Sequence, residues 1–214
     1  NLTSQQPLWR ALGNSFFYAI LTTVICLLIC SIAGYGFEVY HDKGKDRLFS
    51  ILLLAMMVPQ VATMVPLFKM FSKAKLLNTS IGFILPIIST PFMIMMFRQN
   101  ARAFPVDIIE AARIDGANQF QIYWKIFMPI MKPSLILVGV LNMLTVWNDY
   151  LGPLIFLQDR SKYTLALGLA SFKGVHSTQI IPMLCITIIM IIPPIIIFII
   201  AQKYIVEGTS GSIK

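Results

Sequence analysis

Five long apolar stretches alternate with short polar segments along this chain of 214 residues. Each stretch is about long enough to cross a bilayer as a helix, which takes roughly 17 to 25 residues. The stretches lack the strict apolar and polar alternation that lipid-facing barrel strands show. The pattern therefore predicts an all-α integral membrane protein, a polytopic helical bundle forming one transmembrane domain over residues 1–214. The predicted spans are 14–36, 48–70, 81–98, 134–157 and 179–202.

The composition agrees with a membrane location. Hydrophobic residues make up 57% of the chain, charged residues 12%, and the mean hydropathy is +0.77, which is more apolar than a soluble domain can bury in one core. Cys26, Cys30 and Cys185 all fall inside predicted spans, with no His or acid nearby in sequence, so we expect packing thiols and no metal site. His41 and His176 lie in polar connectors and are expected at the surface.

The charge distribution predicts an orientation. A formal net charge of +8 in a soluble protein would suggest a nucleic-acid partner, but here the basic residues cluster beside the ends of the predicted spans, so we expect no nucleic acid. Alternate connectors place the larger share of the 17 Lys and Arg residues on the side that carries the loop 99–133 and the C-terminus. The excess of positive charge found in cytoplasmic loops then predicts that both are cytoplasmic.

The loop 99–133 contains the signals of a short amphipathic helix. Pro105 and Asp107 are typical of a helix start, because proline suits the first turn and an acid suits the positive end of the helix dipole. Ile108, Ile109 and Ala112, with Ala111 beside them, form an apolar stripe, whereas Glu110, Arg113 and Asp115 belong to the wetter face. We expect Gly116 to end this helix.

A second short helix is predicted after Gly116. Aromatic residues recur at three- and four-residue spacing, which predicts one aromatic face, and two prolines are expected to end the helix: Phe120, Tyr123, Trp124, Phe127, then Pro129 and Pro133. Two interpretations fit a pair of amphipathic helices in such a connector. They could lie on the membrane surface as anchors, or they could fit a groove on a soluble partner.

The loop resembles the EAA loop of the permeases of ATP-binding-cassette (ABC) importers. The resemblance rests on an acid, a small pair, a glycine, an isoleucine and a proline at the family's spacing: Glu110, Ala111, Ala112, Asp115, Gly116, Ala117, Ile126 and Pro129. In that family the loop forms a coupling helix that docks in a cleft of the cytoplasmic ATPase. The resemblance therefore implies the type I ABC importer permease fold, and it implies that these residues couple the membrane domain to an ATPase.

The resemblance extends along the whole chain, toward the carbohydrate-importing branch and the second permease subunit of maltose-type systems. It rests on several short motifs: Asn14-Ser15, Tyr35-Gly36-Phe37, Pro59, Pro66, Leu76-Leu77-Asn78-Thr79 and Gln202-Lys203-Tyr204. Two further motifs carry the carbohydrate-specific part: Trp147-Asn148-Asp149 with Pro153-Leu154, and the run 164–169. It implies four kinds of partner in a bacterial or archaeal cytoplasmic membrane: a second homologous permease, a dimer of cytoplasmic ATPase subunits that hold ATP and Mg, an extracytoplasmic sugar-binding protein, and lipid.

The first residues of the chain indicate where it begins within its gene product. Residues 1–10 lack the pattern of a cleavable signal peptide, and the chain does not begin with Met. The resemblance implies one further span before residue 14. We therefore expect the sequence to begin part-way into a longer gene product.

Polar residues inside the fourth predicted span suggest a substrate path. Asp149 lies about 15 residues beyond Ser134, or some 22 Å along a helix, where an ionised carboxylate costs about 2.5 kcal/mol or more unless it faces water or a partner. Sugars need hydrogen-bond partners and aromatic faces, which gives six candidates: Asn142, Thr145, Trp147, Asn148, Asp149 and Tyr150. A structural role is the alternative, with Asp149 capping a broken helix and the asparagines joining neighbouring helices.

No catalytic set can be assembled from the sequence. It contains no G-x-x-x-x-G-K-S/T phosphate loop and no nucleophile, base and orienting acid that could act together, so we expect a non-enzymatic subunit without its own cofactor. Rival interpretations are a permease for another solute, such as a phosphorylated polyol, and a secondary carrier or channel whose loop rests on the membrane. An intramembrane enzyme has the least support.

Overall fold

The computed structural model describes residues 8–40, 42–102, 104–170 and 180–210. His41 and His176 lie outside these ranges, within which no strand occurs, so the all-α prediction is confirmed. The helices are α1 (Leu8–Val39), α2 (Lys43–Ala55), α3 (Gln60–Lys73), α4 (Ser80–Ile84), α5 (Pro91–Ala101), α6 (Val106–Ile114), α7 (Gln119–Ile122), α8 (Met128–Ile130), α9 (Lys132–Trp147), α10 (Leu151–Phe156), α11 (Leu165–Ala170) and α12 (Ile180–Ser210). A π-helical turn, Tyr123–Phe127, joins α7 to α8, and a 3-10 turn, Arg160–Lys162, precedes α11.

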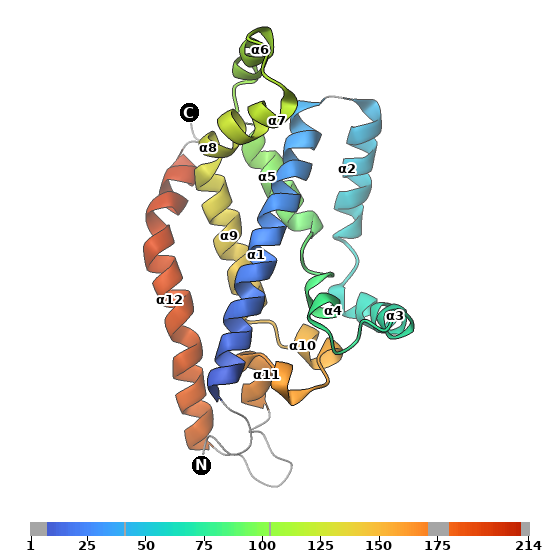
Figure 1. The fold of residues 1–214 in the computed structure, drawn as a ribbon, viewed down its shortest axis with the longest axis vertical. Coiled ribbons are helices and arrows are strands. Elements are labelled where there is room, and N and C mark those ends of the chain that lie inside the picture. The colour runs from blue at the N-terminus through green and yellow to red at the C-terminus, as the bar shows by residue number, and fades with distance from the viewer. Residues whose placement is uncertain (1–7, 41, 103, 171–179, 211–214) are drawn as a thin grey trace.

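Helix α1 is the centre of the bundle, with α5 and α9 packed along it (Figure 1). Its buried face consists mostly of small residues, which let neighbouring helices approach closely. At Gly34 an added Cβ would lie 2.6 Å from Cβ of Phe97 on α5, so a larger residue there would push the two helices apart. Cys26 and Cys30 are fully buried on the same face, as expected of packing thiols, whereas Cys185 on α12 is exposed.

Two of the five predicted spans are single long helices. Helix α1 covers 14–36, and α12, which packs along α9 at the edge of the bundle, covers 180–202 of the predicted 179–202; both are long and apolar enough to cross a membrane. Two bent helix pairs could each form one more span: α2 with α3, bent by 100°, and Gln119–Ile130 with α9, bent by 77°. The described residues thus contain two to four candidate spans, and the prediction of five is not confirmed.

The predicted span 81–98 is wrong as a single helix, since α4 ends at Ile84 and α5 begins at Pro91. The sequence carries a capping signal at the start of each helix, and the second of these lies at the break. Thr79 accepts a hydrogen bond from the N–H of Gly82 (3.0 Å), and Thr90 accepts one from the N–H of Met93 (3.3 Å). Side-chain oxygens in these positions satisfy donors that helix starts leave unpaired, so local capping overrides a continuous apolar pattern.

The end of the bundle farthest from α6, called here the opposite end, holds α4, α10 and α11 (Figure 1). It joins residues that are far apart in the sequence. The side-chain amide of Asn14 donates to the carbonyls of Ser161 (2.9 Å) and Tyr163 (3.1 Å), and the hydroxyl of Ser15 accepts from the N–H of Leu165 (2.7 Å). These bonds fix the start of α1 to the loop that leads into α11.

Asn78 connects a second loop to the same region. Its backbone is left-handed (φ 57°), and its side-chain oxygen accepts from the N–H groups of Gln158 (3.3 Å) and Asp159 (3.0 Å). A hydrogen bond from the N–H of Ser161 (2.8 Å) holds the pKa of the Asp159 carboxyl below its usual range. The motif segments 14–15, 76–79 and 164–169, together with the loop 158–163, therefore form one hydrogen-bonded network, called here the opposite-end network.

Candidate functional site

Helix α6 projects beyond the bundle at the end that carries the loop 99–133 (Figure 1). Its buried face consists of Ile109, 1% exposed, and Ala112, which pack onto the cluster around Tyr35 and Phe127. The other members of the predicted apolar stripe, Ile108 and Ala111, are exposed, so that part of the prediction is wrong. A helix of 9 residues at a tip meets the protein on one narrow face, so few of its side chains are buried.

The sequence Asp115-Gly116-Ala117 ends α6, as predicted. Gly116 has φ +83°, a left-handed conformation that glycine adopts without steric cost. Its N–H donates to the carbonyl of Arg113 (3.1 Å), and the N–H of Ala117 donates to the carbonyl of Ala112 (2.9 Å). This is the Schellman pattern, in which two otherwise unpaired carbonyls of the last turn are satisfied.

Asn118 starts the next helix two residues after Gly116. Its side chain accepts from the N–H of Gln121 (2.8 Å), while the Gln121 side chain accepts from the N–H of Asn118 (2.9 Å). This capping box did not enter the sequence analysis, although the spacing Asn-x-x-Gln is a recognisable signal. The chain reversal between α6 and α7 is thus fixed by local bonds on both sides of Gly116.

The second helix runs further than predicted. It continues from Gln119 through the π-helical turn to Ile130, so Pro129 does not end it. In the π-helical turn the N–H of Met128 donates to the carbonyl of Tyr123, which adds a residue to the turn immediately before Pro129. Pro133 lies in the first turn of α9 and does not end the helix either, because a helix start needs no N–H donor there.

The four aromatic residues of this helix divide between two faces, which corrects the single face predicted. Tyr123 and Phe127 are buried against Tyr35, with ring centroids 5.4 and 4.7 Å away. The hydroxyls of Tyr123 and Ser31 are 2.7 Å apart, which ties the loop to α1. Phe120, 71% exposed, and Trp124 face outward. Ile126 is partly buried and packs against the same cluster.

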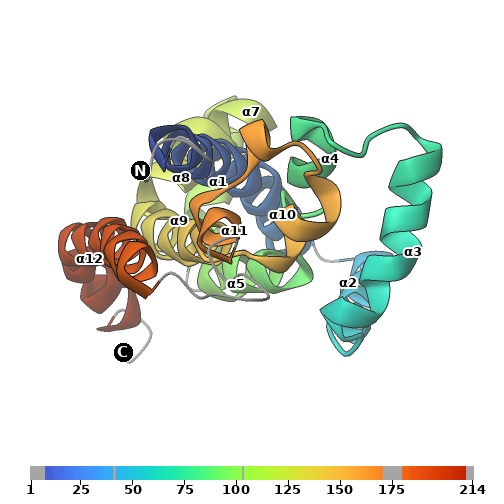
Figure 2. The same cartoon turned by 90° about the horizontal axis from the view of Figure 1, so that it is seen from below.

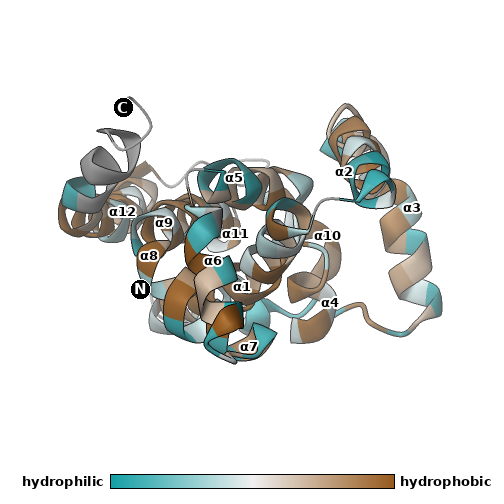
Figure 3. Ribbon diagram, turned by 90° about the horizontal axis from the view of Figure 1, so that it is seen from above, coloured by the Kyte–Doolittle hydropathy of each residue, from teal (hydrophilic) through white to brown (hydrophobic). Residues whose placement is uncertain are grey.

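The exposed tip is called here the coupling surface: Ile108, Glu110, Ala111, Ile114, Asp115 and Gly116. Apolar and charged residues lie side by side on α6 (Figure 3). Ile114 is 86% exposed, and neither Glu110 nor Asp115 forms an ion pair with any residue in the described part of the chain. Exposed isoleucine beside unpaired carboxylates, on a backbone fixed by caps, is typical of a surface that binds another protein.

A buried arginine lies beneath the loop. The guanidinium of Arg98 on α5 bonds to Glu38 at the end of α1 (3.2 Å) and to Asp46 on α2 (3.1 Å). Its central carbon lies 4.0 Å from the ring centroid of Phe49. This ionic cluster holds together three helices at the end of the bundle that carries α6.

The six candidates for a substrate path do not line one surface. Asn142 is buried and donates to the hydroxyl of Thr23 on α1 (3.1 Å), as in the helix-joining alternative. Trp147 is also buried, and its indole N–H donates to the carbonyl of Met190 on α12 (3.0 Å). Asp149 accepts from the N–H of Gly152 in the first turn of α10 (3.1 Å). These three side chains all have structural partners within the chain.

A cavity of about 280 Å³ lies between α5 and α9. Asn142, Thr145 and Asp149 line it from α9 and the break after α9. Thr90, directly before α5, and Phe92 on α5 also line it, and the sequence analysis did not select either of them. The signal that could have identified Thr90 is its position as a helix cap directly before Pro91.

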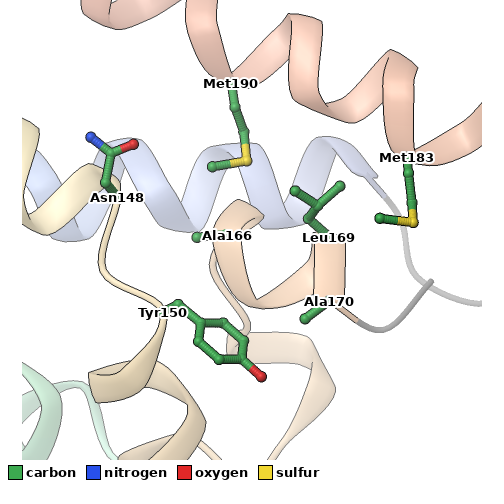
Figure 4. Close-up of a pocket in the computed structure, with 7 residues that line it drawn as sticks. All are labelled: Asn148, Tyr150, Ala166, Leu169, Ala170, Met183 and Met190. Atoms are coloured by element: carbon green, nitrogen blue, oxygen red, sulfur yellow. The ribbon is translucent and has the colours of Figure 1, made fainter. Parts of the chain in front are cut away.

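A second cavity, of about 420 Å³, lies where the loop after α9 meets α11 and α12. Asn148 and the ring of Tyr150 line it on one side, and Met183 and Met190 reach toward it from α12 (Figure 4). Among the residues that the structure describes, the linings of both cavities include polar groups and aromatic rings but no lysine or arginine. This described lining suits a neutral polar ligand more than an anion.

Known proteins resemble this chain over most of its length. Residues 28–211 match the family model "binding-protein-dependent transport system inner membrane component". The lactose transport system permease protein LacG of Rhizobium radiobacter is 37% identical over 94% of this chain and 74% of its own length. The arabinooligosaccharides transport system permease protein AraQ of Bacillus subtilis is 38% identical over 94% of this chain and 72% of its own length.

The fold has a close counterpart among solved structures. A bacterial ABC transporter involved in the import of the acidic polysaccharide alginate superposes with a TM-score of 0.85 at 24% identity, over 95% of this chain and 77% of that chain. The family model and both permeases match this chain over most of its length. The chain therefore belongs to the family of binding-protein-dependent transport system inner membrane components.

Proposed function

We propose that this chain is a transmembrane permease subunit of an ATP-driven importer of sugars, most simply of oligosaccharides. The similarity to permeases named for lactose and arabinooligosaccharides supports this substrate class. The chain forms half of the translocation path in a bacterial or archaeal cytoplasmic membrane. It assembles with a second homologous permease, two copies of an ATPase and an extracytoplasmic sugar-binding protein. It is non-catalytic, and ATP and Mg bind to the ATPase.

The single observation that supports a coupling role is that the coupling surface is exposed on a fixed backbone. Its backbone is fixed by the Schellman end and the capping box, while Ile114, Ala111 and Glu110 are exposed. A soluble partner can therefore bind the coupling surface without unfolding α6. The loop and C-terminus face the cytoplasm, which the distribution of basic residues supports.

Movement of the coupling surface reaches the membrane through α9. The segment Gln119–Ile130 is followed directly by α9 after a bend of 77°, and Tyr123 connects the same segment to α1. When ATP binding closes the ATPase dimer, the coupling surface moves with it, and α9 changes its tilt. Residues of α9 line the smaller cavity, and Asn148, directly after α9, lines the larger one, so a tilt changes the access to both.

The sugar path uses the residues of this region whose side chains remain open to it. Thr145, Asn148 and Tyr150 are exposed and contact the sugar, whereas Asn142, Trp147 and Asp149 hold the wall in place through their bonds to Thr23, Met190 and Gly152. The described lining residues of the two cavities include no lysine or arginine, which disfavours a phosphorylated polyol. Membership of a binding-protein-dependent family disfavours a self-sufficient carrier.

Adjacent alanines provide a test of the coupling role. Ala111 is exposed and Ala112 is buried, although the two differ by one position. In the purified complex, Ala111→Cys is expected to cross-link to a cysteine on the ATPase surface, and Ala112→Cys is not. The measurement is the fraction of chain that shifts to the cross-linked mass under oxidation.

Two outcomes would contradict the proposed function. One is a complex that still imports sugar on addition of ATP but never forms the Ala111→Cys cross-link. The other is a chain that brings down no ATPase on purification and transports sugar after reconstitution alone, as a secondary carrier would.

A further inference from the structure

Helix α12 contains two adjacent prolines, Pro193 and Pro194, and runs through them as one helix. In an α-helix the N–H of each residue donates to the carbonyl four residues earlier, and proline has no N–H. Pro194 therefore cannot supply the bond to the carbonyl of Met190. Pro193 likewise cannot supply the bond to the carbonyl of Ile189. The regular bonding of α12 is thus interrupted at two successive carbonyls.

The indole of Trp147 replaces the missing donor at one of these carbonyls. Its N–H donates to the carbonyl of Met190 (3.0 Å). Helix α12 is one of the candidate membrane spans, and a backbone carbonyl left without a donor in hydrocarbon is strongly unfavourable. Neighbouring helices can satisfy the backbone groups that a proline leaves free in a membrane span. The bond from Trp147 therefore takes the place of a helix bond, but it comes from another helix.

Trp147 is itself held firmly. It is the last residue of α9 and is 3% exposed. Its ring packs edge to face against Phe16 of α1, with the ring centroids 4.8 Å apart. Helix α12 lies beside α9 at the edge of the bundle (Figure 2). The side chain therefore attaches α12 to the end of α9 at the point where the bonding of α12 itself is interrupted.

This attachment borders the larger cavity. Met183 and Met190 reach toward the cavity from α12, and Asn148, directly after α9, lines it from the other side (Figure 4). The indole thus joins two walls of one cavity. Because regular bonds are missing at Pro193 and Pro194, the part of α12 before them changes direction more easily than a regular helix would.

We propose that Trp147 is a positioning residue for transport, which makes residues 180–190 of α12 follow the end of α9. When α9 changes its tilt, the indole carries the carbonyl of Met190 with it, and α12 bends at the two prolines. Both walls of the larger cavity then move together, so its lining stays complete while the access to it changes. This inference rests on the proposed function, which supplies the movement of α9.

The test first isolates the bond in the purified importer complex. Trp147→Phe removes the indole N–H but keeps an aromatic ring. Pro194→Ala supplies a backbone N–H to the carbonyl of Met190, which can accept two hydrogen bonds, so the indole of an unchanged Trp147 can still bind. Pro193→Ala is the matched control, because its new N–H reaches a different carbonyl.

Thermal unfolding of the complex measures the bond. Trp147→Phe is expected to lower the unfolding midpoint by about 2–4 °C, the shift that one lost hydrogen bond produces in a chain of this size. The same change should have little effect in the Pro194→Ala background and its full effect in the Pro193→Ala background. An equal loss in both backgrounds would overturn the inference, because the indole would then not replace the missing helix donor.

The distance between two spin labels measures whether α12 follows α9. One label is attached to Leu184→Cys, before the prolines, and the other to Val65→Cys on α3, across the bundle from α12 (Figure 2). The three cysteines of the chain are replaced by alanine. Ile199→Cys, beyond the prolines, takes the place of Leu184→Cys in the control. A bend of about 10° at the prolines moves position 184, about 15 Å away along the helix, by roughly 3 Å.

In the Pro194→Ala chain, ATP is expected to shift the distance from position 184. Trp147→Phe in the same background should remove most of this shift and leave the distance from position 199 as it was. This background also keeps the test decisive if Trp147→Phe alone fails to fold. The inference is overturned if the shift survives the loss of the indole, since Trp147 would then be only structural, or if ATP causes no shift at position 184. The proposed function fails separately if no ATPase copurifies with the chain.

Discussion

The end that carries the loop 99–133, called here the coupling-loop end after its proposed role, and the opposite end both carry motifs of the family, but the motif residues have opposite surroundings. At the opposite end, Asn14, Ser15 and Asn78 bond to backbone groups between 80 and 150 residues away along the chain. At the coupling-loop end, Gly116 and Asn118 form bonds only within a few residues, and Glu110 and Ala111 are exposed. Motif residues that satisfy one another maintain the fold, whereas motif residues left exposed on a fixed backbone are available to a partner.

Two glycines show the same difference. At Gly82, next to the opposite-end network, an added Cβ would lie 2.0 Å from the carbonyl oxygen of Leu76, so glycine is required for space. At Gly116 nothing lies within 4 Å of an added Cβ, and glycine is required for its φ of +83°. One glycine is fixed by a distant backbone contact and the other by a local turn.

The largest expected effect is that of Gly82→Ala. The new methyl group meets a backbone carbonyl that cannot rotate away, so we expect a loss of more than about 4 kcal/mol in the free energy of unfolding, with most of the chain failing to accumulate. Thermal unfolding and yield of the purified complex measure this. Gly36→Ala is the matched control, because nothing lies within 4 Å of its added Cβ on α1, and it should be neutral or slightly stabilising. Equal yields for both variants would contradict the structural role of the opposite end.

A middle-sized effect is expected for Arg98→Ala, beneath the coupling loop. The change leaves Glu38 without its buried partner and removes the contact to Phe49, so we expect a loss of about 3–5 kcal/mol in stability. Arg102→Ala is the control: Arg102 is mostly exposed, lies 3.7 Å from the same Glu38, and should change stability by less than about 1 kcal/mol. Similar losses for both arginines would show that the burial of Arg98 has no special role.

Local signals made the coupling-loop end largely predictable from the sequence. Pro105 and Gly116 bound α6 as expected, because caps act within a few residues. The direction in which Ile108 and Ala111 point was not predictable, since it depends on how much of the short helix the bundle covers. The opposite-end network left no local signal: the partners of Asn14 and Asn78 are determined by folding, not by spacing.

The substrate path was the least predictable part. Polar residues on one helix suggested one lining, but Asn142 and Trp147 have partners on α1 and α12 that no pattern within residues 132–147 could indicate. The continuous apolar stretch 81–98 concealed the break before Pro91, because the cap at Thr90 is a weaker signal than hydrophobicity. Both errors come from contacts or caps that compete with periodicity.

The smallest effect on stability, and the one that best separates the two ends, is expected for Gly116→Ala. A left-handed conformation costs a residue with a Cβ about 1–2 kcal/mol, and there is open space for the methyl group, so the fold should survive. The strain is relieved by distortion of the turn, which moves α6 relative to α7, so ATP hydrolysis should continue while sugar import falls. Gly116→Asn is the control, because asparagine tolerates the left-handed region and should retain more transport than alanine despite its larger side chain. Uptake of labelled oligosaccharide per ATP hydrolysed measures the coupling, and an unchanged ratio in Gly116→Ala would mean that the geometry of this turn does not transmit the motion.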